Sequence, residues 1–180
     1  MIYKNIDIKN YKVISEKVND YVVKKTSILE GKNNVWNNLN IEDTLFHVPE
    51  LYEAFREMGD IIPQQLTIFK VDPGGTITIH TDGGKYSRLL WPIKNCEGSY
   101  TKFFKVEESN IERVINNQHK SSYGHIKNPE LAELIHSVEL LQPIVFKPWV
   151  PHGIWTNPSL KEPRLTLTVF FDKTLDFLLV

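Results

Sequence analysis

Two residues that can bind a metal lie at the end of the stretch TITIHTD, residues 76–82. Ile77 and Ile79 alternate there with polar residues, which is typical of a β-strand with one buried face. Residues two apart in a strand point to the same side, so His80 and Asp82 share a face. A neutral imidazole and a carboxylate are good ligands for a divalent transition metal. The pattern therefore predicts part of a metal site.

The best third ligand is His152, in the stretch KPWVPHGIWTN, which lies 70 residues after Asp82. Two histidines and one carboxylate on one face of an octahedron form the triad of non-haem iron(II) oxygenases, with three positions left open. The alternative is that these histidines are surface or hydrogen-bonded residues, because a His-x-Asp pattern also arises by chance. Surface or core roles are expected for the other histidines, which are His47, His119, His125 and His136.

A second group of residues follows in PRLTLTVFF, residues 163–171, where apolar and polar side chains alternate. One face carries Leu165, Leu167 and Val169, and the other carries Arg164, Thr166 and Thr168. If the leucine face packs under helices, the polar face lines a cavity. There Arg164 would clamp a carboxylate and Thr166 would donate a hydrogen bond to it, while a dicarboxylate such as 2-oxoglutarate chelates the metal with its other end. The alternative is a half-exposed strand with its polar face in water.

The order HTD (80–82), then a distant His152, then RLT (164–166) resembles that of the 2-oxoglutarate- and iron(II)-dependent dioxygenases. The resemblance covers roughly residues 61–172. It implies a double-stranded β-helix, which is the jelly-roll or cupin-like fold. It also implies that iron(II) binds the two histidines and the aspartate, and that the arginine and threonine hold the 2-oxoglutarate co-substrate. The implied reaction is hydroxylation of an amino-acid side chain or a small molecule by molecular oxygen, with release of succinate and carbon dioxide.

The stretches RLLWPIKNCEGS and PHGIWTN are most similar to the aspartyl/asparaginyl β-hydroxylase branch of these enzymes. This likeness implies that Arg88 contacts the co-substrate or the substrate, and that Asn157 shapes the site. Many members of the branch have glycine in place of the carboxylate ligand, whereas this chain keeps Asp82. The retained carboxylate argues against a halide-binding site.

The elements that would position these residues change in type along the chain. Residues 11–25 space their apolar side chains as one helical stripe, and a second helix has Pro49 at its first position and stops at Gly59. The shared face of this second helix would carry Leu51, Phe55 and Met58. Strand-like stretches dominate from residue 61 onward, which favours an antiparallel sandwich or barrel covered by helices.

The expected organisation is a single oxygenase-like domain, with a helical part over about residues 1–60 and a β core over about 61–180. Within the core, NPELAELIHSVELL reads as a helix with Asn128 as its cap and Pro129 at its first position. The polar segment 107–125 is expected to be either a lid or a solvated loop.

The composition narrows the expected partners. The net charge of −1, from 21 basic and 22 acidic residues, gives no reason to expect nucleic acid, and no apolar run is long enough for a membrane span. The polar start does not resemble a secretory signal, and Cys96 is the only cysteine, so a reducing, cytoplasmic location is expected.

Other functions remain open at this point. One is a cupin-type metal enzyme that does not use 2-oxoglutarate, although the chain has no second His-x-His pattern of the kind that such proteins commonly use. Another is a non-catalytic β-sandwich interaction module with incidental histidines. For an oxygenase, the expected partners are molecular oxygen and a small-molecule or peptidyl substrate, whose identity the sequence does not show.

Overall fold

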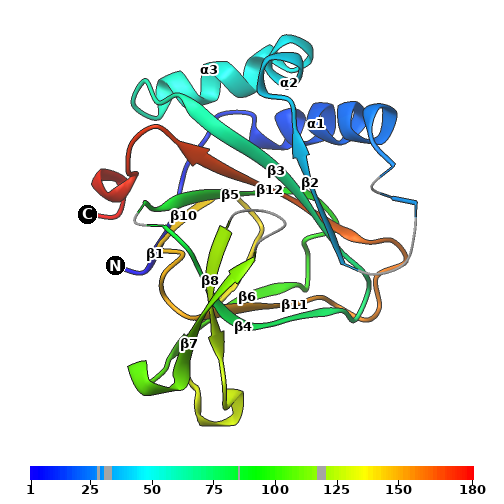
Figure 1. The fold of residues 1–180 in the computed structure, drawn as a ribbon. Coiled ribbons are helices and arrows are strands. Elements are labelled where there is room, and N and C mark those ends of the chain that lie inside the picture. Colours follow the sequence, from blue (N-terminus) through cyan, green and yellow to red (C-terminus); the bar gives the residue numbers. More distant parts are fainter. Residues whose placement is uncertain (28, 31–33, 85, 117–120) are drawn as a thin grey trace.

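The structure is a computed structural model that describes residues 1–27, 29–30, 34–84, 86–116 and 121–180. Its elements form three layers, with helices over one six-stranded sheet and a second six-stranded sheet beneath it (Figure 1). Neighbouring strands in both sheets are antiparallel. The chain is thus mostly β, and its jelly-roll architecture confirms the expected fold class.

The sheet under the helices, sheet A, has the strand order β1-β10-β5-β12-β3-β2. Its strands are β1 (Tyr3–Asn5), β2 (Val35–Leu39), β3 (Pro63–Val71), β5 (Arg88–Lys94), β10 (Ile144–Phe146) and β12 (Arg164–Phe171). In β12, Leu165, Leu167 and Val169 are fully buried in the core that the helices cover. The expectation for this face is confirmed, so the alternating residues Arg164 and Thr166 lie on the inner face of sheet A.

The second sheet, sheet B, has the order β7-β8-β4-β11-β6-β9. Its strands are β4 (Thr76–Asp82), β6 (Tyr100–Lys105), β7 (Ile111–Asn116), β8 (Ser121–Ile126), β9 (Glu133–Glu139) and β11 (His152–Trp155). The sequence separates β4 and β11 widely, but in the sheet they are direct neighbours. This pairing brings the histidines of the two strands to the same level.

Three helices cover the outer face of sheet A: α1 (Tyr11–Lys25), α2 (Ile41–His47) and α3 (Pro49–Glu57). The α3 helix starts at Pro49 as expected, and Leu51 and Phe55 are fully buried. The Phe55 ring meets that of Phe171 edge to face, with centroids 5.1 Å apart. Burying one such side chain stabilises the fold by about 1.5–3 kcal/mol. Met58, just past the helix, is 9% exposed, so the expected shared face is confirmed.

The expected helix over residues 128–141 is wrong. A short 3-10 turn, Pro129–Leu131, leads into β9, which pairs with β6 along its whole length. Asn128 does not act as a helix cap, because the side chain of Asn110 binds both its backbone N–H and its backbone carbonyl, each at 2.9 Å. The free edge of β6 offers backbone hydrogen bonds to the segment, and this tertiary pairing outweighs its local helix propensity.

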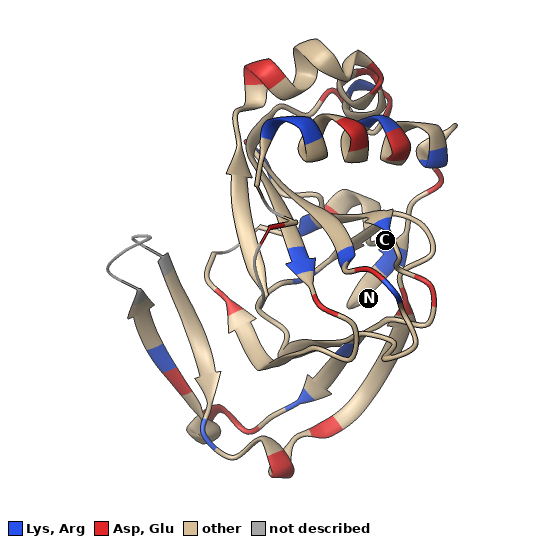
Figure 2. Ribbon diagram, turned by 90° about the vertical axis from the view of Figure 1, so that its right-hand side faces the viewer, with Lys and Arg blue, Asp and Glu red and all other residues tan. Residues whose placement is uncertain are grey.

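The polar segment 107–125, expected as a lid or a solvated loop, contains the β7–β8 hairpin. Strand β8 pairs with β4 and thereby extends sheet B, and the hairpin reaches away from the other strands of that sheet (Figure 2). The first 60 residues likewise add two strands, β1 and β2, to the edges of sheet A. His119 and Lys120 lie outside the described residues.

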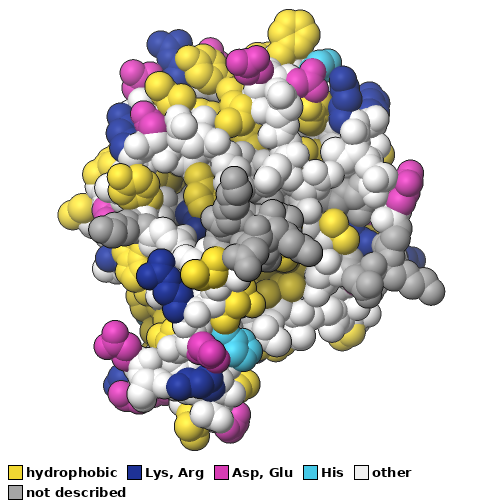
Figure 3. Space-filling model, in the orientation of Figure 1, with side chains coloured by type: hydrophobic (Ala, Val, Ile, Leu, Met, Phe, Trp, Pro, Cys, Tyr) yellow, Lys and Arg dark blue, Asp and Glu magenta, His cyan; other side chains and the backbone are white. Residues whose placement is uncertain are grey.

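Charged residues of both signs are interspersed over the helices and strands (Figure 2). The face seen in Figure 3 shows the same mixture, with hydrophobic side chains between the charges. Within the described ranges, the helices are all too short or too polar to cross a membrane.

Candidate metal centre

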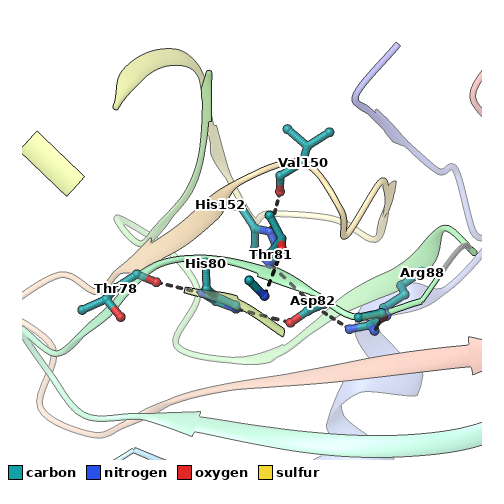
Figure 4. A network of polar contacts seen from close by, with 9 residues as sticks. Thr78, His80, Thr81, Asp82, Arg88, Val150 and His152 are labelled. Carbon is teal, nitrogen blue, oxygen red and sulfur yellow. Dashed lines mark hydrogen bonds and ion pairs between the residues drawn. The ribbon is translucent and has the colours of Figure 1, made fainter. Parts of the chain in front are cut away.

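The three expected metal ligands come together between the sheets. His80 and Asp82 lie on β4, and His152 is the first residue of β11, where it pairs directly with His80. One ligand atom from each of the three residues lies within 4.8 Å of the other two (Figure 4). A set of two imidazoles and one carboxylate at this separation fits a divalent transition metal.

Backbone hydrogen bonds orient both imidazoles. Nδ1 of His80 lies 2.8 Å from the carbonyl oxygen of Thr78, and Nδ1 of His152 lies 2.8 Å from that of Val150. A carbonyl only accepts, so each Nδ1 carries a hydrogen, and the neutral ring presents an Nε2 lone pair. These Nε2 atoms lie 3.3 Å (His80) and 3.8 Å (His152) from the Asp82 carboxylate. Such outer hydrogen bonds are typical of histidines that bind metals.

The protonation states of the three residues differ. Burial lowers the pKa of His152 to about 4 against the opposing charge of Asp82, so this ring is neutral at neutral pH. Burial acts to raise the pKa of Asp82, but the hydrogen bond with His80 and the charges of His152 and Arg88 outweigh it, and the pKa lies well below its usual range. Burial alone would lower the pKa of His80, yet its hydrogen bond and ion pair with Asp82 raise it.

Arg88 lies beside this centre. Its Nη1 donates to Oδ2 of Asp82, and its Nη2 donates to the carbonyl oxygen of Gly83 at 2.7 Å. The guanidinium carbon lies 3.8 Å from the ring centroid of Phe170, which is a cation–π contact. The structure thus brings Arg88, which begins β5, to the carboxylate of the predicted metal site.

Arg164 and Thr166 form a second polar group on the inner face of sheet A. Arg164 is 0% exposed, and none of its three guanidinium nitrogens has a hydrogen-bond partner among the residues that the structure describes. The Thr166 hydroxyl is also buried and, within the same residues, unpaired. Burial lowers the pKa of Arg164, as expected for a charge removed from water, against the opposing effect of the neighbouring Cys96 thiol. A buried charge without a partner is strongly unfavourable, so this end of the interior fits an anion.

The inner face of β12 connects the two groups. Every second residue of the strand lies on this face, which gives the row Arg164, Thr166, Thr168 and Phe170. The Phe170 ring contacts the Arg88 guanidinium. Six residues of strand span about 20 Å. The two arginines therefore belong to opposite ends of one row, and the expected metal ligands contact the Arg88 end.

Sequence reasoning missed a second unpaired hydroxyl, that of Thr101 on β6. This atom is buried and has no hydrogen-bond partner in the described part of the chain. Thr101 is two residues from Phe103, whose ring lies 6.2 Å from that of His152, so both side chains face the interior. The alternation of Thr101 and Phe103 in the sequence was the available signal.

The β8 strand, which was not expected, places two further residues beside the ligands. His125 pairs with His80 and Tyr123 pairs with Asp82. Directly opposed residues share a face of the sheet, so both side chains lie next to the centre. Asn157, expected to shape the site, accepts a hydrogen bond through its side-chain oxygen from the backbone N–H of Ser159 at 2.9 Å, within its own loop.

Comparison with known proteins gives a likeness of fold. Neither the family models nor the curated protein sequences contain a match to this chain. Among solved structures, HygX from Streptomyces hygroscopicus, with nickel and 2-oxoglutarate bound, is similar at a TM-score of 0.57 and 11% identity, over 96% of this chain and 82% of that one. The non-haem α-ketoglutarate-dependent carbocyclase SnoK of nogalamycin biosynthesis gives a TM-score of 0.57 at 10% identity, over 94% and 78%.

A prolyl-4-hydroxylase from Pseudomonas putida is also similar, with a TM-score of 0.54 and 12% identity over 95% of this chain and 92% of that one. At these identities the likeness shows a shared fold. The jelly roll of this protein is therefore one on which 2-oxoglutarate-dependent oxygenases are built.

Proposed function

We propose that the protein is a 2-oxoglutarate- and iron(II)-dependent dioxygenase that hydroxylates an amino-acid side chain or a small molecule. The observation that carries this proposal is that one interior holds both a cluster of two histidines and an aspartate and, on the facing sheet, a buried arginine with no anionic partner among the described residues. The cluster suits a metal, and the arginine suits the carboxylate of a co-substrate.

The neighbouring structures support the proposal through their chemistry. HygX is described with nickel and 2-oxoglutarate bound, and SnoK as an α-ketoglutarate-dependent enzyme. The likeness to the aspartyl/asparaginyl β-hydroxylase branch rests on two sequence stretches alone. A peptidyl substrate and a free small molecule are both compatible with the site.

In the proposed enzyme, His80, Asp82 and His152 hold iron(II) through Nε2 of each ring and the carboxylate. Iron(II), when bound with 2-oxoglutarate, supplies the oxygen chemistry that oxidises the substrate. The backbone carbonyls that bind each Nδ1 keep the imidazoles in the tautomer that a metal needs. Because both rings are fixed before the metal arrives, little conformational freedom is lost on binding.

Arg164 and Thr166 would bind the distal carboxylate of 2-oxoglutarate. A guanidinium can donate two parallel hydrogen bonds to a carboxylate, and the threonine hydroxyl can donate a third. Complete burial of Arg164 excludes water and strengthens this charge-assisted contact. The same burial selects for a ligand with an anionic group at the end far from the metal.

The test is turnover of 2-oxoglutarate. Purified protein with iron(II), ascorbate and 2-oxoglutarate should form succinate above a metal-free control, even without the natural substrate. His152→Ala should abolish succinate formation because it removes a ligand, whereas Arg113→Met on the exposed β7 strand should leave it unchanged. Absence of succinate, together with no thermal protection by 2-oxoglutarate, would favour an interaction module.

A further inference from the structure

The two oxygens of the Asp82 carboxylate have different environments. Oδ1 lies 3.3 Å from Nε2 of His80, whereas Oδ2 accepts a hydrogen bond from Nη1 of Arg88 (Figure 4). Side-chain exposure is 26% for Asp82 and 10% for Arg88, so the ion pair is mostly shielded from solvent. His80 therefore faces Oδ1, whereas Oδ2 is bound by Arg88 and also lies 3.8 Å from Nε2 of His152.

Arg88 is itself fixed in place. Its Nη2 donates to the Gly83 carbonyl oxygen at 2.7 Å, and its guanidinium carbon lies over Phe170 at 3.8 Å from the ring centroid. Phe170 belongs to the central strand β12, which is paired on both sides. The donor that reaches Oδ2 thus rests on a ring of a strand that pairs with β3 at this position.

A carboxylate can bind a metal through one oxygen or through both. With two histidines and one carboxylate oxygen, an octahedral metal keeps three open positions, whereas two carboxylate oxygens leave only two. A chelating co-substrate fills two positions, so only the first arrangement leaves one for molecular oxygen. The reaction proposed above therefore needs a carboxylate that binds through one oxygen.

We propose that Arg88 is a positioning residue that restricts Asp82 to one metal-binding oxygen, Oδ1. Its hydrogen bond occupies a lone-pair site of Oδ2, and its positive charge disfavours approach of a second cation to that oxygen. The inference rests on the proposed function, because the need for three open positions comes from the chelating co-substrate.

The same contacts argue against a direct role for Arg88 in holding a carboxylate of co-substrate or substrate. Nη1 and Nη2 both have acceptors within the protein, and the residue is only 8% exposed. Of its nitrogens, Nε alone is unpaired within the described residues, and it is buried. A ligand would have to displace Asp82 or Gly83 to receive the two-pronged contact that arginine offers.

The experiment counts the water molecules on bound manganese(II), a paramagnetic probe of the site. Full-length wild type, Arg88→Met and Arg88→Lys are loaded with manganese(II), and the bound waters are counted by water-proton relaxation and electron–nuclear double resonance. Three waters are expected in the wild type. Two are expected in Arg88→Met, where both carboxylate oxygens can bind, and three again in Arg88→Lys, which keeps a cationic donor. Arg113→Met is the matched control for loss of an arginine and should retain three.

An unchanged water count in Arg88→Met would overturn the inference, and so would weaker 2-oxoglutarate binding in that variant with the metal environment unaltered. Should Arg88→Met fail to fold, a crystal structure of the manganese-loaded wild type decides, since Asp82 bound through both oxygens contradicts the role given to Arg88. If the water counts follow expectation but the wild type does not bind 2-oxoglutarate, the proposed function fails and the role of Arg88 stands. If the wild type binds no manganese(II), both fail.

Discussion

Arg88 and Arg164 are both buried on the inner face of sheet A, but only Arg88 has an anionic partner in the described structure. At the Arg88 end, the chain supplies the carboxylate of Asp82, a backbone carbonyl and an aromatic ring. At the Arg164 end, all three guanidinium nitrogens and the Thr166 hydroxyl lack partners within the described residues. This difference is the basis of the proposal that Arg164 binds a ligand, whereas the contacts of Arg88 lie within the protein.

The largest expected effect is on the affinity for 2-oxoglutarate, which should distinguish Arg164 from Arg88. Arg164→Met should weaken 2-oxoglutarate binding on the order of a hundredfold or more, because it removes a buried charged donor. Manganese(II) affinity should stay near the wild-type value, since Arg164 contacts none of the three expected ligands. Calorimetric titration of each ligand measures both constants. Equal loss of both affinities would mean that the arginine only supports the fold.

The second expected effect is on the free energy of unfolding of the metal-free protein, and it should have opposite signs for the two arginines. Arg88→Met leaves Asp82 without its cation and should destabilise the fold by about 2–4 kcal/mol, reduced somewhat by the partial exposure of Asp82. Arg164→Met replaces an unpaired buried charge with an apolar chain of similar length and should stabilise the fold by about 1–4 kcal/mol. Urea unfolding of both variants, with Arg113→Met as control, gives the comparison. Destabilisation by Arg164→Met would indicate that this arginine has a structural partner.

The pH dependence of metal affinity is a further test, because the histidines near Arg88 can be protonated. The pKa of His80 is raised above its usual 6.5, so below that raised pKa the ring is protonated and a metal must displace the proton. Metal affinity should therefore fall as the pH drops, by up to about tenfold per pH unit. His152, with a pKa of about 4, should add nothing above about pH 5. A metal affinity that is flat from pH 8 to pH 5.5 would contradict the assignment of His80 as a ligand.

The smallest effects should come from the neutral hydroxyls. Thr166→Val should weaken 2-oxoglutarate binding by about tenfold, the lower end of the value of one hydrogen bond to a charged group. It should not destabilise the metal-free protein, because the hydroxyl has no partner in the described structure. Thr101→Val tests whether sheet B also contributes, and an unchanged affinity would mean that the Thr101 hydroxyl does not bind 2-oxoglutarate. Titration calorimetry and urea unfolding measure both variants.

The parts that the sequence could predict are those where chemistry and strand alternation agree. His80 and Asp82 are two apart in a strand, and their residue types limit what they can bind. Alternation likewise separates Arg164 from Leu165, so the buried leucine face and the inward polar face could both be foreseen. In each case a local period of two carries the information.

The parts that it could not predict depend on partners far away in the chain. Residues 128–141 have a helical pattern, but the free edge of β6 and the side chain of Asn110 determine their conformation. The β7–β8 hairpin is polar and therefore gives little signal. The contact between Arg88 and Asp82 requires the turn from β4 to β5 to close, and the spacing of six residues does not reveal whether the arginine faces carboxylate, ligand or solvent.

Strands β4 and β8 pack so closely beside the proposed metal site that two positions have no room for a side chain. A Cβ atom on Gly83 would lie 2.1 Å from the backbone oxygen of Ser122, and one on Gly124 would lie 2.3 Å from the Thr81 hydroxyl. The Gly124 N–H also donates to that hydroxyl at 3.1 Å. Because Gly124 lies against the Thr81 hydroxyl and binds it, a shift of β8 would disturb Thr81. Thr81 lies between His80 and Asp82, so a movement of the β7–β8 hairpin would be transmitted to two of the three residues that would bind the metal.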